Sequence, residues 1–257
     1  MEFIRSRQNP LVKHLLKLAE SRRDRLKSQQ ALLVGTHLVQ SALAAGWPLE
    51  KMLVCEGFET REEISTLLAQ TNTAITMLGS DIFKAIEQAP SSTGLMAVIA
   101  MPAATPLRTD GLCLLLENIQ DPGNVGTILR TAAAAGADQV WLTPGCADIW
   151  SPKVLRAAMG AHFHLSLYER IDPRTALESF TGPLAITTLA EAESLYATDL
   201  RGSLVLALGA EGAGISPELA ARATRRIHIP MEACIESLNV AAAAAVCLFE
   251  RRRQILQ

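Results

Sequence analysis

Five short runs of almost uninterrupted apolar residues occur in the second half of this 257-residue chain. Strands that are apolar on both faces are typical of a parallel sheet covered by helices on both sides. Segments with helical character lie between the runs, so the sequence predicts an α/β domain built on a parallel sheet. The predicted strands are 112–116, 139–142, 184–187, 204–208 and 227–229, and the predicted helices are 124–135, 152–159, 217–223 and 238–252.

The first hundred residues show the same alternation on a smaller scale. A helix is predicted from Asn9-Pro10, since Asn can cap a helix and Pro is tolerated at its first position. Strands are predicted at 31–34, 51–56, 74–78 and 94–101, and helices at 36–45, at 60–70 and from Ser80 to a point before Pro90. Residues 102–110 contain two prolines and no apolar period, which indicates a linker. We therefore expect two domains, residues 1–104 and residues 111–257.

Composition excludes several classes of protein. Hydrophobic residues make up 49% of the chain and charged residues 19%, which supports a buried core and excludes wholesale disorder. The longest apolar run, 238–249, is interrupted by Asn239 and is too short to span a bilayer. The chain starts without an apolar signal core, and its five cysteines are scattered with no Cys-x-x-Cys spacing, which argues against a disulfide framework and a zinc site. We expect a cytoplasmic protein with no membrane segment and no metal.

The net charge of −2 is unevenly distributed. Residues 1–30 carry eight Lys or Arg and three Asp or Glu, whereas the rest of the chain is acidic. A local basic patch on a nearly neutral protein is compatible with a polyanion partner. A solvated helix face explains the same charges, and the sequence leaves both interpretations open.

Three segments bring polar residues and glycines to the end of a predicted strand. The first, 117–132, follows the strand at 112–116 and opens a helix, and the carboxyl ends of parallel strands are where ligands usually bind. Asn124 lies in the opening turn. Arg130 lies at the border of the apolar stripe of the helix, from which its side chain can reach a cleft. A helix cap and a surface cation are the alternative interpretation.

The second and third segments also allow two interpretations. Residues 206–216 run from a buried strand into a glycine-rich turn with Gly209 and Glu211, and glycine lets a ligand approach the backbone. This turn matches neither Gly-x-Gly-x-x-Gly nor a Walker loop, and an ordinary strand-to-helix turn would also explain it. The third segment brings Ser237 and Asn239 to the start of an alanine-rich helix, where they can cap the helix or orient a ligand.

Taken together, the order, content and spacing of the three segments resemble the motifs of the SpoU (TrmH-like) family of RNA 2′-O-ribose methyltransferases, within the SPOUT superfamily. The matching positions are Asn124, Gly126 and Arg130-Thr131 in the first motif, Leu208-Gly209, Glu211 and Gly214 in the second, and Ile229-Pro230-Met231 with 237–241 in the third. The resemblance covers about residues 111–253, and segments 151–156 and 160–161 are similar to a further segment of the family. The first hundred residues resemble the family's RNA-binding substrate domain, an α/β fold shared with some ribosomal proteins.

The resemblance implies a parallel α/β domain whose C-terminal segment is threaded as a trefoil knot. It also implies that S-adenosyl-L-methionine binds in the knot, held largely by main-chain atoms at Gly209, Ile229 and Leu238. A side chain at Gly209 is then expected to occupy cofactor volume. Members of the family are usually dimers with sites close to the subunit interface, so we expect a homodimer.

The implied reaction is the transfer of a methyl group to a ribose 2′-hydroxyl of RNA, with ribosomal RNA favoured over transfer RNA as the substrate. The implied catalytic residues are Arg130, Asn124, Glu211, Ser237 and Asn239. Because a guanidinium is effectively always protonated, Arg130 is expected to stabilise a developing alkoxide and to fix a phosphate rather than to act as a base. The other four residues would orient Arg130 or the ribose.

Two other function classes stay open at this point. A nucleotide-dependent enzyme of Rossmann type shares the α/β pattern, although the chain lacks Gly-x-Gly-x-x-Gly. A non-catalytic RNA-binding protein of the same fold is the second, and the presence of Arg130, Glu211, Ser237 and Asn239 argues against it. Titration with S-adenosylmethionine tests the first alternative, and an assay with a labelled methyl donor tests the second.

Overall fold

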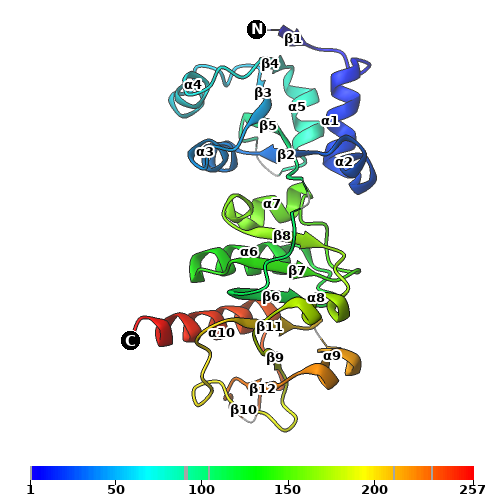
Figure 1. The fold of residues 1–257 in the computed structure, drawn as a ribbon. Coiled ribbons are helices and arrows are strands. Elements are labelled where there is room, and N and C mark those ends of the chain that lie inside the picture. The colour runs from blue at the N-terminus through cyan, green and yellow to red at the C-terminus, as the bar shows by residue number, and fades with distance from the viewer. Residues whose placement is uncertain (1, 90–91, 104, 211, 233) are drawn as a thin grey trace. The chain divides into compact units, whose positions relative to one another are not determined.

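The computed structural model describes residues 2–89, 92–103, 105–210, 212–232 and 234–257. Contacts between residues divide the chain into two compact units. The first unit comprises residues 1–103 together with 150–163, and the second comprises 104–149 and 164–257. Each unit contains one sheet with helices packed on it (Figure 1).

The sheet of the second unit has seven strands in the order β10-β12-β9-β11-β6-β7-β8, and every pairing in it is parallel. The strands are β6 (Leu112–Leu116), β7 (Gln139–Leu142), β8 (Ser166–Glu169), β9 (Leu184–Thr187), β10 (Glu193–Ser194), β11 (Leu204–Leu208) and β12 (Arg225–His228). All five strands predicted from apolar runs are present, which confirms the parallel α/β sheet. The sequence did not reveal β8, whose residues are half-buried, or the two-residue β10, because neither forms a continuous apolar run.

Four helices of the second unit cover this sheet. They are α6 (Pro122–Ala135), α8 (Pro173–Ser179), α9 (Pro217–Arg222) and α10 (Val240–Ile255). Ala176 of α8 and Leu219 of α9 join Leu115 of β6 in one apolar core. α6 and α10 pack against each other through faces that bury small residues such as Ala132 and Ala244, and Figure 1 shows the two helices side by side. The sequence did not predict α8, because Ala176 is its one buried residue and gives no apolar period.

The sheet of the first unit has five strands in the order β1-β4-β3-β5-β2. They are β1 (Glu2–Ile4), β2 (Gln30–Val34), β3 (Leu49–Cys55), β4 (Ile75–Leu78) and β5 (Leu95–Ala100). β5 runs antiparallel to β3 and β2 and the other pairs are parallel, so this sheet is mixed. The four predicted strands are present. β1 is an addition, because three residues of which Ile4 alone is buried show no periodicity.

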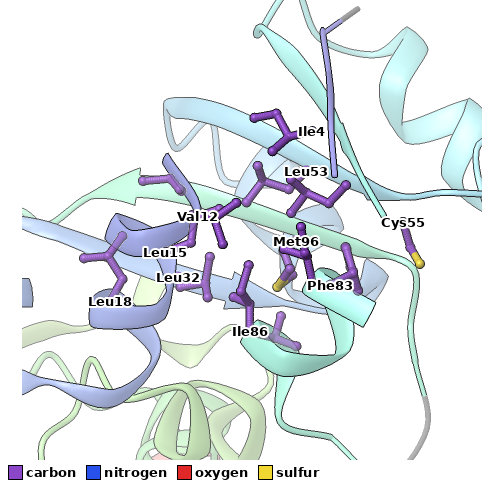
Figure 2. Packing of buried hydrophobic residues seen from close by; sticks show 14 residues of the cluster. Ile4, Val12, Leu15, Leu18, Leu32, Leu53, Cys55, Phe83, Ile86 and Met96 are labelled. Carbon is purple, nitrogen blue, oxygen red and sulfur yellow. The ribbon is translucent and has the colours of Figure 1, made fainter. Parts of the chain in front are cut away.

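The helices of the first unit cover both faces of its sheet. They are α1 (Pro10–Glu20), α2 (Arg22–Ser28), α3 (Thr36–Ala44), α4 (Glu62–Ala69), α5 (Ser80–Glu87) and α7 (Pro152–Ala158). Figure 2 shows the core under α1 and α5, where Leu15, Leu18 and Phe83 pack with Leu32 and Met96 of the sheet. This core fixes α1 and α5 on one face.

The basic segment at residues 1–30 forms two helices where the sequence indicated one. Ser21 ends α1 and caps α2, since its hydroxyl accepts a hydrogen bond from the Asp24 backbone N–H at 3.2 Å. Arg25 is buried, and its Nη1 donates to the carbonyl of Leu18. Lys13, Lys17 and Lys27 are exposed. One of the eight basic residues is therefore structural and is removed from the surface charge.

The predicted helix at 152–159 is α7, and its contacts place it in the first unit although it follows β7 in sequence. α7 packs near β2. The 3-10 turn that follows it, Ala161–Phe163, brings the Phe163 ring to 5.3 Å from the Trp47 ring, centroid to centroid. At Gly160, which has a φ of +89°, an added Cβ would lie 2.7 Å from the Ser41 Cβ. Residues 150–163 are therefore a closely packed part of the first unit.

Within the described ranges, no helix combines the length and apolar composition needed to cross a bilayer. The same residues include no group of three His, Cys, Asp or Glu that is placed to hold a metal ion. The five cysteines are free thiols. Burial raises the pKa of Cys247 to about 12, so this thiol stays protonated at neutral pH.

Candidate functional site

A cavity of about 1360 Å³ lies in the second unit at the carboxyl ends of β9, β11 and β12. These ends meet at one edge because the sheet is parallel, and this edge is where ligands bind in open α/β sheets. Ile186, Leu208 and Ile227 from the strand ends form part of its apolar wall. The loop after β11 and the segment that leads from β12 to α10 supply most of the remaining lining.

Five of the residues predicted from the sequence line this cavity. Gly209 follows β11, Ile229 follows β12, and Ser237, Leu238 and Asn239 precede α10. Ile229 is half-buried, whereas Ser237, Leu238 and Asn239 are exposed. The structure thus gathers the three predicted cofactor residues and two of the predicted catalytic residues around one cavity.

The turn that begins at Gly209 closes on its own backbone. An added Cβ at Gly209 would lie 2.1 Å from the carbonyl carbon of Gly214 and 2.5 Å from the nitrogen of Ile215. The N–H of Gly214 donates to the carbonyl of Ala210 at 2.8 Å, and Gly212 and Gly214 have φ values of +83° and +67°. The fold of the turn therefore requires glycine at 209. The resemblance in sequence predicts glycine there for another reason, namely that a side chain would occupy the volume of the cofactor. A Gly209→Val variant would displace the turn itself.

Glu117 anchors the far end of this turn. It is the first residue after β6, and its Oε2 accepts from the Ser216 backbone N–H at 2.7 Å while its Oε1 accepts from the Ser216 hydroxyl at 2.6 Å. The Ser216 oxygen also caps α9 by accepting from the Leu219 N–H at 3.2 Å. Sequence reasoning did not single out Glu117 as a site residue. A carboxylate directly after a buried strand was the signal available.

Asn124 and Asn239 join the first and third motifs. The Asn239 Nδ2 donates to the Asn124 Oδ1 at 3.0 Å, while the Asn239 Oδ1 accepts from the Ala241 N–H at 3.0 Å and the Ala242 N–H at 3.3 Å. Asn239 therefore caps α10 and bonds to α6 with the two ends of one amide. Asp121, not Asn124, caps α6, because its Oδ1 accepts from the Asn124 N–H at 2.8 Å. The helix accordingly begins at Pro122, two residues before the predicted start.

Arg130 stands apart from this group. Arg130 is exposed on α6 and does not line the cavity. Its side chain makes no hydrogen bond or ion pair with any other residue in the described part of the chain. Glu211 lies outside the described residues. The structure therefore brings together Asn124, Ser237 and Asn239 near the cavity and leaves Arg130 on the surface of α6.

The remaining polar lining defines what the cavity can bind. The His228 Nδ1 lies 3.1 Å from the Ala192 carbonyl oxygen, and the Arg226 Nη2 donates to the Ala220 carbonyl at 3.3 Å. Glu232 and Glu236 are exposed on the lining and add negative charge. Apolar walls, main-chain groups and carboxylates suit a ligand with a flat ring system and a positive charge, and S-adenosylmethionine has both.

Glu117→Gln is expected to weaken the binding of S-adenosylmethionine about tenfold, because an amide group would face the two Ser216 donors with only one acceptor and would loosen the turn at Gly209. Isothermal calorimetry measures this affinity. Glu178→Gln, an exposed carboxylate on α8, is the matched control and should bind like the unchanged protein. Equal affinities for the two variants would contradict the anchoring role of Glu117.

Family models match both halves of the chain. The model described as the SpoU rRNA Methylase family matches residues 111–249. The model described as the MRM3-like substrate binding domain matches residues 9–97. The first match includes all the predicted site residues, and the second covers most of the five-stranded sheet of the first unit.

Relatives are similar to the chain over nearly its whole length. The 23S rRNA (guanosine(2553)-2′-O)-methyltransferase RlmP of Bacillus subtilis is 35% identical, with 98% of this chain and 100% of that protein covered. A tRNA/rRNA methyltransferase of Synechocystis is 36% identical over 98% of this chain and 93% of its own length. The human mitochondrial rRNA methyltransferase 3 is 29% identical over 94% of this chain and 71% of its own length.

Solved structures have the same fold. The SpoU methyltransferase AviRb of Streptomyces viridochromogenes, in complex with the cofactor AdoMet, superposes with a TM-score of 0.89 at 26% identity, covering 97% of this chain and 99% of that one. An rRNA methyltransferase of Sinorhizobium meliloti superposes with a TM-score of 0.87 at 26% identity, covering 100% of this chain and 99% of that one.

The strand order excludes the Rossmann alternative. In a Rossmann sheet the first strand is flanked by the second and the fourth, whereas β6 is flanked by β7 and β11, and β9 lies beyond β11. Residues of the second and third motifs meet at the cavity described above, and both the family model and the full-length relatives match. The chain belongs to the SpoU rRNA methylase family.

Proposed function

We propose that this protein transfers the methyl group of S-adenosylmethionine to a ribose 2′-hydroxyl of ribosomal RNA. The observation that carries the proposal is the single cavity at which residues of the second and third motifs meet, with the first motif bonded to it through Asn124 and Asn239. Relatives named as rRNA methyltransferases over almost the full length of the chain support the choice of ribosomal RNA.

The cofactor-binding residues are Gly209, Ile229 and Leu238. All three line the cavity, and Gly209 contributes main-chain atoms to it, since glycine has no side chain. The bound cofactor supplies an electrophilic methyl group on a sulfonium. Because that methyl is already activated, the protein has to align the hydroxyl with it and stabilise the charge that develops on the hydroxyl oxygen.

Arg130, Asn124, Glu211, Ser237 and Asn239 are the catalytic residues in this proposal. Arg130 provides a planar fork of donors that stabilises the developing alkoxide and holds a neighbouring phosphate. Ser237 and Asn239 on the cavity wall orient the ribose, and Asn124 holds Asn239 in place through their hydrogen bond. A 2′-hydroxyl acceptor requires RNA and not DNA.

The C-terminal segment is threaded as a trefoil knot in this proposal. β12 is separated from β6 by β9 and β11, yet α10, which follows β12, packs on α6, which follows β6. The chain therefore crosses the carboxyl edge of the sheet past the turn at Gly209 to reach α6. That path supports the threaded arrangement found in the family.

The protein acts as a homodimer in this proposal. Apolar side chains remain exposed on α10 and in the segment before it, with Phe249 48% exposed and Ile235 52% exposed. A second copy of the chain would cover them. Arg130 is exposed on α6, the helix that packs against α10, so a dimer formed there would place Arg130 close to the interface.

Residues 1–104 form the RNA substrate-binding domain and residues 111–257 the SPOUT methyltransferase domain in this proposal. The exposed Lys13, Lys17 and Lys27 supply a cationic face for the RNA backbone. The cytoplasm is the proposed location, which agrees with five free thiols and with a bacterial rRNA methyltransferase as a full-length relative.

Mapping of ribose 2′-O-methylation in total RNA tests the function. Cells that lack the gene should lose the modification at one ribosomal nucleotide, and the purified protein with labelled S-adenosylmethionine should restore it. Loss of a transfer RNA modification instead would identify the alternative substrate. Cofactor-independent RNA binding with no transfer to any RNA would identify a non-catalytic RNA-binding protein.

Arg130→Ala should bind S-adenosylmethionine normally and methylate RNA on the order of 100–1,000-fold more slowly, because a donor that acts only in the transition state is lost. Arg130→Lys keeps the charge without the planar fork and should recover little of the rate. Single-turnover methylation at saturating RNA and cofactor measures both. A near-normal rate in Arg130→Ala would remove Arg130 from the mechanism.

A triple variant with Gln at Lys13, Lys17 and Lys27 should bind RNA more weakly and with a shallower salt dependence. Each lost phosphate contact lowers the slope of log K against log salt by roughly 0.7–0.9. The matched control replaces three exposed arginines of the second unit, Arg108, Arg170 and Arg201, by Gln. An unchanged slope in the lysine variant would favour the solvated-face interpretation.

A further inference from the structure

A second cavity, of about 320 Å³, lies at the carboxyl ends of β6 and β7. It is separated from the larger cavity by the chain between β11 and α9. Ile215 lines the larger cavity and the next residue, Ser216, lines the smaller one; Leu219 lines the smaller cavity and Ala220 the larger. The two cavities are therefore neighbours on opposite sides of one segment, at the edge of the sheet where ligands bind.

This small cavity is lined by three apolar residues and by a larger number of polar and charged ones. Leu219 is 3% exposed, and Pro144 and Pro173 complete the apolar surface. Asn118 and Glu218 lie on the rim and are exposed. The three apolar residues offer a surface on which a planar ring can pack, and the polar residues suit a ring with hydrogen-bonding edges.

The cations at the rim are already paired. Arg174 donates to both carboxylate oxygens of Asp172 at 3.1 Å and lies 3.6 Å from Glu218. Arg222 donates to the Arg174 carbonyl at 2.8 Å and lies 3.8 Å from Glu178. These pairs leave no surplus positive charge for a phosphate. The cavity therefore favours a neutral ligand.

Two groups at the rim can form hydrogen bonds with an uncharged ring. Asn118 has a φ of +56°, and its Oδ1 accepts from the Gln120 Nε2 at 3.3 Å, while its Nδ2 donates to no other residue in the described ranges. Glu218, with its side chain 67% exposed, offers acceptor oxygens. Together they present one donor and one acceptor to the edge of a base, the combination by which proteins recognise unstacked bases of RNA.

We propose that this small cavity binds the base of the nucleotide whose ribose is methylated. The inference rests on the proposed function, since it takes the larger cavity as the cofactor site. A base held beside Ser216 places its own ribose at the segment between the two cavities. The small cavity then selects which base is presented to the methyl donor, and the motif residues need no contact with the base.

A double-mutant cycle between the cavity and the RNA base tests this proposal. One substrate is an oligoribonucleotide that contains the nucleotide identified by mapping. The other has an abasic ribose at that position, which keeps the 2′-hydroxyl. The protein variants are Asn118→Asp, which exchanges the donor for an acceptor at the same shape, and Glu218→Ala. Asp110→Asn, an exposed carboxylate outside both cavities, is the matched control.

The wild-type protein should prefer the intact RNA over the abasic RNA in kcat/KM. Each rim variant should reduce that preference at least about fivefold, by losing rate on the intact RNA and not on the abasic one. The control should keep the wild-type preference, and calorimetry should show unchanged binding of S-adenosylmethionine in all variants.

Retention of the wild-type preference in both rim variants, or no preference in the wild type, would overturn the proposal. Equal losses on both RNAs would assign the rim to the RNA backbone and would also overturn it. In each of these outcomes the wild-type protein still methylates the intact RNA. Absence of methylation by the wild type would instead mark the failure of the proposed function, and the base site would fail with it.

Discussion

The pairing of β11 with β6 is the contact on which the candidate site depends. Five consecutive residues are in parallel register, from Leu204 opposite Leu112 to Leu208 opposite Leu116. The residue that follows each strand, Gly209 or Glu117, therefore emerges at the same edge, and the Glu117 N–H donates to the Leu208 carbonyl at 2.9 Å. A slip of one residue would exchange the faces of every side chain and would move the Glu117 carboxylate away from Ser216.

Hydrogen bonds that end the helices also build the site. The Asn239 amide caps α10 with its oxygen and holds Asn124 with its nitrogen, and the Ser216 hydroxyl caps α9 while it binds Glu117. Capping contributes to stability, typically about 1 kcal/mol for each cap. Because the same atoms position the motif residues, the wall of the larger cavity cannot loosen without destabilising the ends of two helices.

The division of the chain into units is not a simple cut at the linker. Residues 150–163 follow β7 of the second unit in sequence but pack within the first unit, where the Phe163 ring meets Trp47 and Gly160 allows close approach to Ser41. Residues 150–163 come from the half of the chain that the methylase family model matches. They are nevertheless part of the fold of the first unit, the one that the substrate-binding-domain model matches. The first unit is therefore incomplete without residues 150–163, which come from the far side of the linker.

The sequence by itself determined the parallel sheet, because strands that are apolar on both faces leave few other architectures. It placed Asn239 near the start of the last helix but left open whether Asn239 caps that helix or orients a ligand. It also contained the motif spacing that identified the family. Only the tertiary structure decided that Glu117 holds Ser216, 99 residues away, and that Asn239 holds Asn124, 115 residues away. The tertiary structure alone showed that Arg25 is buried. It also showed that position 209 requires glycine because the backbone of the same turn lies against it. These contacts join residues that strand order brings together, and local periodicity encodes which face of an element is apolar but not which element lies next to it.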